Sequence, residues 1–226
     1  SVDITTAATT ITGSSYAAIA AAYASNSIKG LGNEAITPTG SITVTQANTL
    51  NALTPGVVTA TISDTSEAAL AGLTDNSVAV DNAYTITPAG TFSAAALTAL
   101  NAKTSEDIDA TNITTLTGTL AEVAEVYTST GTQAGITNIL NKAVTISDTG
   151  SLDADLFAQI NGRTTNAVTV SGTVTNLTGS AANIKQLFVD KIDSTPVDTV
   201  FTDNPTVTIT GATAAAADLI SINGDT

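Results

Sequence analysis

A strand, a turn glycine and a short helix recur along this chain in one register, and this repetition constrains the fold more than any other feature of the sequence. The register is defined by Gly40, Gly90 and Gly150. A large apolar residue follows each glycine by two positions, a leucine or isoleucine by ten, and an asparagine by eleven. These residues are Ile42, Phe92 and Leu152, then Leu50, Leu100 and Ile160, then Asn51, Asn101 and Asn161. Such agreement is hard to reach by chance, so we interpret these stretches as copies of one structural unit.

Residues 144–161 indicate what a single copy builds. Apolar and hydroxyl residues alternate over residues 144–147, which favours a half-buried strand with Ile146 facing inward. Residues 148–150 predict a turn, because aspartate bonds nearby amides and glycine readily adopts a positive φ. We expect Ser151 to cap the helix that follows and Gly162 to end it in a left-handed conformation. The apolar face of this helix consists of Leu152, Leu156, Phe157 and Ile160.

Neither the strand nor the helix can bury its apolar face alone, so a neighbouring copy has to cover it. The predicted strand centres are Ile11, Ile36, Ile62, Ile86, Leu116, Ile146, Val170 and Ile209. Their spacing of 24 to 39 residues is typical of a solenoid. The sequence therefore predicts an α/β repeat solenoid of about eight strand–turn–helix coils, with a parallel sheet on one side. If the helical segments prove to be strands, the fallback is a three-sided β-solenoid.

The domain prediction is a single solenoid array over residues 1–226. Its last gap leaves room for an extra strand near residues 197–201, and residues 42–45 fit either a helix start or a second strand. Both ends look like interior copies, whereas solenoids usually carry polar capping repeats. We therefore expect the chain to be part of a longer array or a subunit that assembles end to end.

Composition narrows the classes of function. Hydrophobic residues make up 42% of the chain but aromatic residues only 4%, which indicates a thin core between closely stacked layers. The formal net charge is −14, so we expect no nucleic-acid partner, and anionic membrane surfaces would repel the chain. The most hydrophobic run, residues 17–24, is too short for a bilayer, so no membrane insertion is expected.

Catalytic chemistry has few candidates here. The chain has no histidine and no cysteine, which removes the commonest general base and every Ser-His or Cys-His dyad. Two carboxylate pairs remain, Glu122 with Glu125 and Asp153 with Asp155. The first fits a solvated helix face and the second fits charges at a helix start. The sequence therefore predicts no enzyme, no catalytic residue and no cofactor, with calcium as the one ligand to consider.

Calcium prefers oxygen ligands, and acidic residues cluster in two places. Glu106, Asp107 and Asp109 form the densest acidic loop, while Asp198 and Asp203 flank a second one. These five residues are the candidate metal ligands, although no stretch matches an EF-hand loop. Turn-capping by aspartate is the alternative interpretation. Asp64 and Asp148 share a repeat position that Pro38 and Pro88 occupy in other copies, so no continuous metal ladder runs there.

Hydroxyl residues suggest a surface lattice. Strands carry Thr-x-Thr or Thr-x-Ser pairs at Thr10/Thr12, Thr61/Ser63, Thr85/Thr87, Thr115/Thr117, Thr145/Ser147, Thr169/Ser171 and Thr208/Thr210. Stacked at about 4.8 Å, these pairs would form a flat array of hydroxyl and methyl groups that orders water, which makes ice binding an alternative function. The simpler explanation is that threonine suits any exposed sheet face.

The repeated asparagines Asn51, Asn101 and Asn161 fit either a buried ladder between copies or plain helix ends.

The pattern T-I-[ST]-[DP]-x-G-[ST]-[LIF], followed by an alanine-rich helix ending in [LI]-N, has a known counterpart. It resembles the repeats of very long secreted and cell-surface proteins of marine cyanobacteria and related bacteria, which run VTISDTAAN into an alanine/leucine helix. Residues 144–148, 61–64 and 208–223 carry the resemblance, which extends over most of the chain. It implies an extracellular or cell-surface location and a surface, adhesion or envelope role, with no catalytic residues to transfer.

From these observations we expect a non-enzymatic structural repeat module of an extracellular surface layer, adhesin or filament. The alternatives are an ice-binding protein that uses a Thr-x-Thr sheet face and a structural protein of a phage virion. The expected partners are further copies of the chain, joined end to end, or flanking repeats of the same polypeptide. Uncapped solenoid ends expose sheet edges that invite such pairing, and a contact of this kind that does not close builds a filament.

Overall fold

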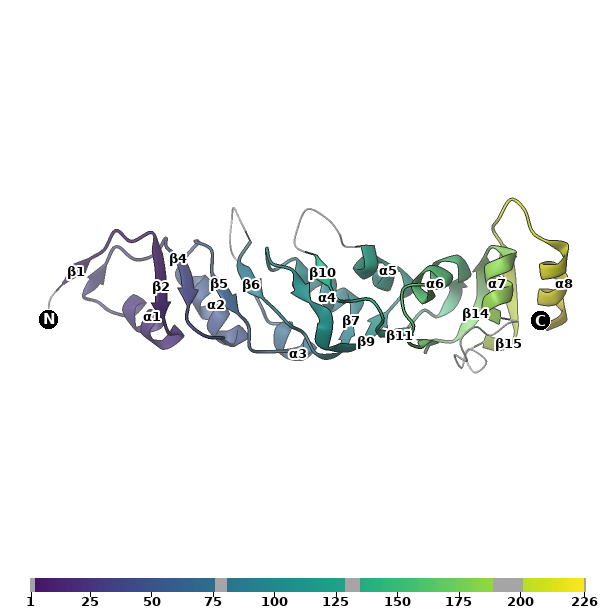
Figure 1. The fold of residues 1–226 in the computed structure, drawn as a ribbon, viewed down its shortest axis with the longest axis horizontal. Helices are drawn as coiled ribbons and strands as arrows, with labels where there is room; N and C mark the ends of the chain where they lie inside the picture. Colours follow the sequence, from purple (N-terminus) through teal and green to yellow (C-terminus); the bar gives the residue numbers. More distant parts are fainter. Residues whose placement is uncertain (1–2, 76–80, 129–134, 189–200, 226) are drawn as a thin grey trace. The chain divides into compact units, whose positions relative to one another are not determined.

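The computed structural model describes residues 3–75, 81–128, 135–188 and 201–225. Over these residues, short strands paired in parallel alternate with helices along the chain, so the mixed α/β fold predicted from the sequence is confirmed (Figure 1). The structure divides into two compact bodies. The first comprises Ser1–Phe92, Ala96–Asn112 and Ser129–Asn138, and the second comprises Ser93–Ala95, Ile113–Thr128 and Ile139–Thr226.

We call a helix together with the strands that precede it a unit. The elements of the first body are β1 (Ile4–Thr5), β2 (Thr10–Ser14), α1 (Tyr16–Tyr23), β3 (Ile28–Lys29), β4 (Ala35–Pro38), α2 (Val44–Leu53), β5 (Thr59–Thr61), α3 (Glu67–Leu70), β6 (Ala83–Thr85), β8 (Ile108–Asp109), the 3₁₀ turn η1 (Ala110–Asn112) and β10 (Ile136–Thr137). β7 (Gly90–Ser93) and α4 (Ala94–Asn101) cross the division between the bodies.

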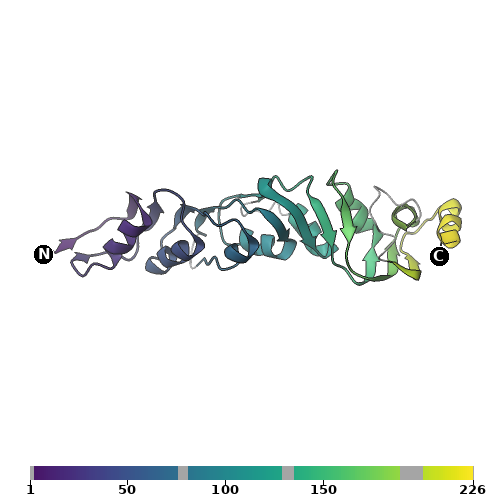
Figure 2. The same ribbon diagram turned by 90° about the horizontal axis from the view of Figure 1, so that it is seen from below.

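In the first body, parallel pairs link each unit to the next along the chain. β1 pairs with β3, β2 with β4, β5 with β6, and β8 with β10. Isolated parallel bridges join Ile36 to Val58, Ile42 to Ile62, and Ile86 to Ile108. Helices α1, α2 and α3 follow one another in a row, with the strands to one side of that row (Figures 1 and 2).

The second body follows the same rule. Its elements are β9 (Ile113–Gly118), α5 (Leu120–Thr128), β11 (Ala143–Ile146), β12 (Gly150–Asp153), α6 (Ala154–Asn161), β13 (Val168–Val170), β14 (Val174–Gly179), α7 (Ala181–Phe188), β15 (Phe201–Ile209) and α8 (Ala216–Asp225). β11 lies between β9 and β13, and β14 lies between β12 and β15, all in parallel. Successive helices from α5 to α8 pack against one another.

The glycine register correctly predicts the core. Gly40, Gly90 and Gly150 have φ angles of +75°, +86° and +79°, a conformation that glycine adopts without steric cost. The apolar residues at the two repeat positions after them are all buried: Ile42, Phe92 and Leu152, then Leu50, Leu100 and Ile160. The thin core therefore runs between the strands and the helices of successive units.

Helix starts are set by local side-chain caps. At α2, the Thr43 hydroxyl accepts a hydrogen bond from Gln46 N at 3.3 Å, and Gln46 Oε1 accepts one from Thr43 N at 3.0 Å. This reciprocal pair satisfies two amides that have no partner within the helix, so residues 42–45 lead into a helix and do not form a second strand. Helices form in each unit, so the condition for the β-solenoid fallback is not met over the described residues.

The predicted strand centres do not all face one another. Ile11 faces Ile36, and Ile146 faces Val170. The other partners differ: Ile36 faces Val58, Ile86 faces Ile108, Leu116 faces Val144, and Ile209 faces Gly179. Val144 and Ile146 both lie in β11 and are both buried, so the alternation of apolar and hydroxyl residues does not distinguish them as the neighbour of Leu116. Most units also contain two strand segments with similar patterns, one before and one after the turn.

The parallel sheet predicted on one side is interrupted over the described residues. The described strands form several short sheets. Pairing shifts register at Thr12/Ser14, Gly150/Ser151 and Val174/Asn176, where the chain turns between the two segments of a unit. Each turn redirects the strand, so neighbouring segments pair locally and the hydrogen-bond ladder is interrupted.

The boundaries of α6 differ from those expected. Ser151 and Leu152 belong to β12, and Asp153 caps the helix by accepting hydrogen bonds from Asp155 N and Leu156 N. Leu156 is only half-buried, and Ala154 takes its place on the inner face. Gly162 has a φ of −65°, so the helix ends in a right-handed conformation. Asp153 caps the helix because it lies directly before the first helical residue, where its carboxylate reaches two amides that have no partner within the helix.

The chain after α7 is described in part. The extra strand expected near residues 197–201 falls mostly outside the described residues, which resume at Phe201 with the first residue of β15. The strand centre predicted at Ile209 is the last residue of β15, and α8 follows it. Among the described residues, none of the helices combines the length and apolar content needed to cross a bilayer.

Candidate functional site

The acidic loop at residues 106–109 is the best candidate for a metal site. Its two aspartates, Asp107 and Asp109, accept hydrogen bonds from other groups of the protein. Asp107 and Asp109 flank the buried Ile108 in β8, so both lie on the opposite face of the strand. Asp107 Oδ1 accepts a hydrogen bond from Gly135 N at 2.7 Å. Asp109 Oδ1 accepts hydrogen bonds from Thr111 N at 3.0 Å, Thr111 Oγ1 at 2.6 Å and Asn138 Nδ2 at 2.9 Å. Both carboxylates thus hold the β8–β10 pair together.

These contacts favour the turn-and-strand interpretation of this loop. Glu106 is exposed beside it. Within the described part of the chain, no three acidic side chains gather in a way that could hold a metal ion. Of the other candidates, Asp198 lies outside the described residues, and so does the side chain of Asp203. Asp107 and Asp109 therefore serve as turn and strand contacts in the described structure.

Two aspartates in equivalent turns reach back to the helix of the preceding unit. Asp64 Oδ2 accepts a hydrogen bond from Val44 N, the first residue of α2, at 2.6 Å. Asp148 Oδ2 accepts one from Leu120 N, the first residue of α5, also at 2.6 Å. The first amides of a helix have no partner within it and carry partial positive charge, so a carboxylate there is stabilising. These aspartates were expected to cap their own turns, and the structure gives them a contact between units.

Asp155 makes the reverse contact, from α6 forward to the start of α7. Its carboxylate accepts hydrogen bonds from Ser180 Oγ at 2.7 Å, Ser180 N at 3.0 Å and Asn183 Nδ2 at 2.7 Å. The hydrogen bond from the Ser180 hydroxyl, with those from the Ser180 amide and Asn183, holds the pKa of Asp155 below its usual value. This site is a half-buried junction between two units.

The two carboxylate pairs noted in the sequence serve separate structural roles. Glu122 Oε2 accepts a hydrogen bond from Thr119 N at 2.8 Å and helps to cap α5, while Glu125 is exposed on the same helix. Asp153 caps α6, and the carboxylate of Asp155 accepts a hydrogen bond from Ser180 Oγ. Neither pair has both carboxylates directed at a common cavity.

Three buried threonines form a contact that the sequence interpretation missed. Thr54, Thr104 and Thr164 lie fourteen residues after the turn glycines, and all are at least 92% buried. Their hydroxyls donate to the carbonyls of Glu34, Tyr84 and Lys142 at 2.7, 2.8 and 2.6 Å. The same hydroxyls accept hydrogen bonds from the amides of Gly56, Glu106 and Asn166 at 2.9, 3.1 and 3.0 Å. We call them the closing threonines, because each ties the loop after a helix to the strand region of the same unit.

The repeated asparagines do not form one ladder. Asn51 is buried, donates to Thr74 Oγ1 at 3.3 Å and accepts from Asn82 Nδ2 at 2.8 Å, so it does bond the following unit. Asn101 is half-buried at the end of α4, and its Oδ1 has no hydrogen-bond partner among the described groups. The ladder interpretation therefore applies to Asn51, while Asn101 is a helix end.

Glu34 is a buried acid with a structural role. Its Oε2 accepts hydrogen bonds from Tyr23 Oη at 2.6 Å, Gly32 N at 2.8 Å and Asn33 N at 3.0 Å. Burial raises the pKa of Glu34, but these hydrogen bonds outweigh burial, and the pKa lies below its usual value. Burial, with the hydrogen bond and charge of Glu34, raises the pKa of Tyr23. The pair ties α1 to the loop before β4.

The hydroxyl rows are short and interrupted. Thr145 lies between Thr117 and Thr169, and Thr169 Oγ1 approaches Thr145 Oγ1 at 3.2 Å. In the neighbouring row, Thr115 faces Ala143. Several hydroxyls donate to carbonyls of the preceding unit, as Ser171 does to Ile146 O at 3.1 Å. Some of the hydroxyl side chains on the strands thus bond the backbone of the neighbouring strand.

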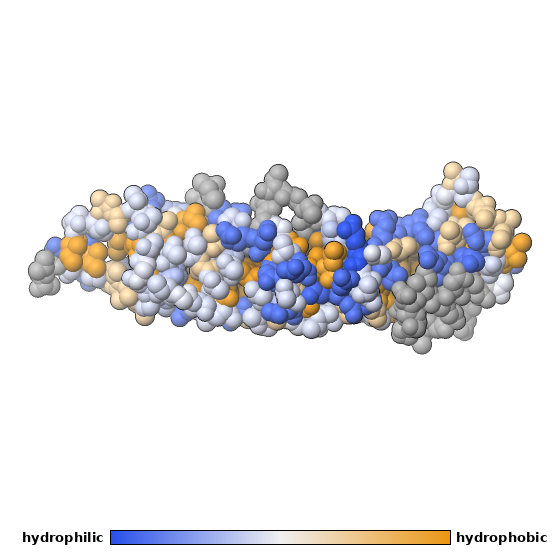
Figure 3. Space-filling view, in the orientation of Figure 1, coloured by the Kyte–Doolittle hydropathy of each residue, from blue (hydrophilic) through white to orange (hydrophobic). Residues whose placement is uncertain are grey.

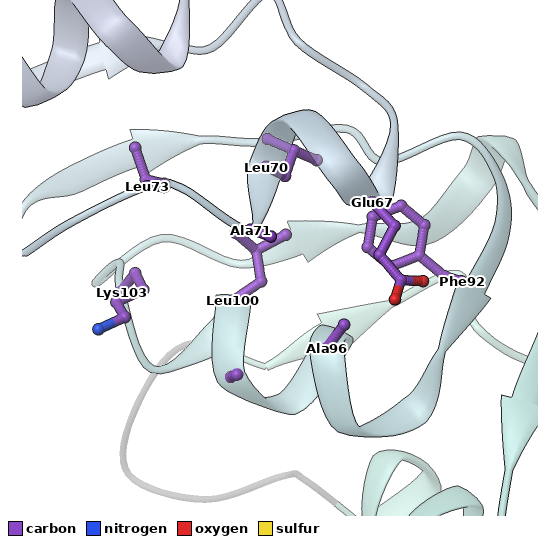
Figure 4. Close-up of a pocket in the computed structure, with 9 residues that line it drawn as sticks. Glu67, Leu70, Ala71, Leu73, Phe92, Ala96, Leu100 and Lys103 are labelled. Atoms are coloured by element: carbon purple, nitrogen blue, oxygen red, sulfur yellow. The ribbon is translucent and has the colours of Figure 1, made fainter.

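An apolar groove lies between α3 and α4, with a volume of about 140 Å³ (Figure 4). Leu70, Leu73 and Leu100 line it, and Glu67 and Lys103 lie on its rim. α3 has only four residues, whereas α4 has eight, so the shorter helix leaves this space open. The lining offers one carboxylate and one ammonium group, without a second acid for general acid–base chemistry.

The buried and hydrogen-bonded polar side chains described above thus mostly make contacts within a unit or between neighbouring units. No protein-family model, no curated protein and no solved structure matches the chain.

Proposed function

We propose that this chain is a non-enzymatic structural repeat module of an extracellular surface layer, adhesin or filament, built as an α/β solenoid of eight coils. The observation that carries the proposal is the pairing pattern. Within each body, the described strand pairs are parallel and join one unit to the next along the chain. An array in which each unit contacts only its neighbours is the defining property of solenoid proteins.

The polar chemistry supports the same function. Asp64, Asp148 and Asp155 bond the backbone of a neighbouring unit, and the closing threonines bond the backbone of their own. An enzyme would instead direct such groups into a cavity. Here the polar groups stabilise the array, which is the task of a structural protein.

The extracellular part of the proposal draws on the resemblance to secreted cyanobacterial repeats and on the net charge of −14. A strongly acidic surface keeps copies soluble and apart in a salty medium. Ice binding and a role in a phage virion remain predictions from the sequence, because the interrupted threonine rows do not favour the first and no feature of the fold favours the second.

The location is tested with antibodies raised against the purified chain, applied to intact and permeabilised cells of the source organism. We expect labelling of intact cells, over the surface layer or over filaments. Labelling only after permeabilisation, or only of released virions, would overturn the proposal. A measurement of thermal hysteresis on the purified chain separates the ice-binding alternative.

The solenoid is tested by hydrogen exchange on the whole chain. In a solenoid, stability varies from unit to unit and terminal units open first, so amides in β1, β2 and α8 should exchange before those in β11 and β13. Uniform protection that is lost in one cooperative event would indicate a single globular core and contradict the solenoid.

A further inference from the structure

We propose that a small hollow between α5 and α6 binds a carboxylate group, with Tyr127 and Arg163 as its hydrogen-bond donors. The hollow lies within the second body, so the inference needs no relation between the two bodies. It goes beyond the proposed structural role and does not depend on it. It is carried by two donors that border one hollow and that have no acceptor among the described residues.

The hollow lies beside the C-terminal halves of α5 and α6, and the apolar part of its wall is formed by Ala124, Leu156 and Ile160. Its volume of about 30 Å³ leaves room for about two water molecules, which is the space that the two oxygens of a carboxylate need. Around α5 and α6, hydrophilic and apolar residues adjoin on the surface (Figure 3). The site thus combines a small polar space with an apolar wall.

Tyr127 supplies the first donor. It lies next to the last residue of α5 and is only 8% exposed. Its hydroxyl is buried and has no hydrogen-bond partner in the described structure. A buried hydroxyl without a partner costs free energy, and native proteins rarely leave one. Because Tyr127 lines the hollow, an acceptor bound there supplies the missing partner.

Arg163 supplies the second donor and is the only arginine of the chain. It follows Gly162 directly after α6, and no carboxylate of the described residues pairs with its guanidinium, although the chain has 20 acidic residues. Burial raises the pKa of Tyr127, and the positive charge of Arg163 opposes that rise. The guanidinium and the hydroxyl therefore lie close enough to act on one bound anion.

The shape of the site favours a carboxylate over other anions. A guanidinium donates two parallel hydrogen bonds to the two oxygens of a carboxylate. A carboxylate also carries its charge on a carbon stem, which the apolar side chains of Ala124 and Leu156 can contact. Such a group comes either from a small aliphatic acid or from an acidic side chain of a second copy. The experiment below distinguishes these two sources.

Arg163 also lies at the C-terminal end of α6, where a positive charge is favourable without any ligand. The test therefore has to show saturable binding. A single arginine gives a single side-chain Nε–H signal in NMR spectra of the isotope-labelled full chain. We expect this signal to shift and reach a plateau as sodium butyrate is added. Sodium chloride at the same ionic strength and the uncharged butyramide should leave it in place.

Three variants assign the contacts. R163Q should abolish the stabilisation of the chain by butyrate, measured as a rise in melting temperature. Y127F should weaken butyrate binding about tenfold, because the carboxylate loses one donor. Without butyrate, Y127F should melt above the unchanged chain, since it no longer buries an unpaired hydroxyl. K29Q is the matched control, because it removes one positive charge from the exposed Lys29 in the first body and should respond to butyrate as the unchanged chain does.

Sedimentation velocity separates the two sources of the carboxylate. A monomeric chain that binds butyrate would assign the site to a small acid. Self-association that both R163Q and excess butyrate abolish would assign it to a second copy. A shift that grows without saturation, or that butyramide reproduces, would overturn the proposal, as would equal butyrate binding by Y127F and the unchanged chain. None of these outcomes bears on surface labelling or on unit-by-unit hydrogen exchange, so the proposed function is tested separately.

Discussion

Asp148 Oδ2 lies 2.6 Å from Leu120 N, so a carboxylate in one unit caps the helix of the unit before it. Asp64 and Val44 repeat this relationship at the same distance. The start of a helix is therefore stabilised by residues that fold as part of the next unit. Such contacts couple neighbouring units energetically, which is what makes a repeat array cooperative.

Replacing Asp148 with alanine should destabilise the second body by about 1–2 kcal/mol, because the Leu120 amide loses a charged acceptor at the helix start. D148N keeps an oxygen acceptor and should cost less. Urea unfolding followed by circular dichroism measures the free energy of unfolding.

The control for Asp148 is T149A, which changes an exposed side chain in the same turn and should have little effect. Amide exchange gives the local readout. D148A should speed exchange at Leu120, and an unchanged rate at that amide would show that the carboxylate does not cap α5.

The closing threonine Thr104 is completely buried, and its hydroxyl bonds the Tyr84 carbonyl. T104V keeps the shape of the side chain but leaves buried carbonyl and amide groups without this partner, so we expect a loss of about 1–3 kcal/mol. T104S retains the hydroxyl and should retain most of the stability. Urea unfolding of the three proteins provides the comparison.

The matched control is T91V, because Thr91 is exposed in β7. Valine favours strands, so this change should be neutral or slightly stabilising. Equal losses in T104V and T91V would mean that burial of the hydroxyl contact is not the cause.

Acid should destabilise the α6–α7 junction. The hydrogen bonds from Ser180 and Asn183 lower the pKa of Asp155 in the folded state. A carboxyl with a lowered folded pKa contributes stability above its unfolded pKa, which is about 3.9 for aspartate, and loses it as the pH falls through the folded value. D155N should therefore be less stable than the unchanged chain at pH 7, with a smaller difference below about pH 3.

Thermal unfolding at a series of pH values checks this expectation. The E34Q variant should behave in the same direction, because hydrogen bonds also lower the pKa of Glu34. A D155N curve parallel to that of the unchanged chain at all pH values would contradict the assignment.

Asp81 should show the opposite sign. Burial, followed by the charge of Asp75 and a hydrogen bond to it, raises the pKa of Asp81. A carboxyl with a raised folded pKa adds stability below its unfolded pKa and loses it as the pH rises through the folded value. At pH 7 the ionised Asp81 is therefore unfavourable, and D81N should raise the melting temperature at pH 7 more than at pH 3. E125Q removes an equal charge from an exposed site and should not reproduce this pattern.

Two glycines should respond differently to alanine. At Gly150 an added Cβ meets nothing nearby, so G150A should cost only the strain of a positive φ, about 1–2 kcal/mol. At Gly172 the Cβ would overlap the carbonyl of Asp148, so G172A has to push two units apart and should cost about 3 kcal/mol or more. Urea unfolding of both variants tests the order, and an equal loss would contradict the close packing of the backbones.

Local patterns predicted the local structure. The turn glycines and the apolar residues after them were identified correctly, because a positive φ and a buried side chain both depend on a few adjacent residues. Pairing was not predictable in the same way. Leu116 faces Val144 and not the strand centre Ile146, because both of these residues are buried on the inner face of β11 and the sequence pattern does not distinguish them.

The sequence did not reveal the contacts of the turn aspartates between units or those of the closing threonines within a unit, for two reasons. Asp64 and Asp148 reach back by 20 and 28 residues, so no fixed spacing marks their partners. The closing threonines do keep a fixed spacing from the turn glycines, but threonine makes up about a fifth of the chain, and this abundance hides any single conserved offset. Alignment on the glycines, extended three residues beyond the asparagines, would have found them.

The hydrogen bond from the helix start of one unit to an aspartate of the next unit determines where such an array can be recombined. A segment cut from the start of a strand to the end of a helix leaves behind the carboxylate that its helix needs. A segment from a helix start to the next turn, such as residues 44–64 or 120–148, carries the helix and its acceptor together. A gene segment duplicated or exchanged at that boundary would carry the helix and its acceptor as one complete contact. The segment that can be inherited as a unit is therefore offset from the repeat that the sequence displays.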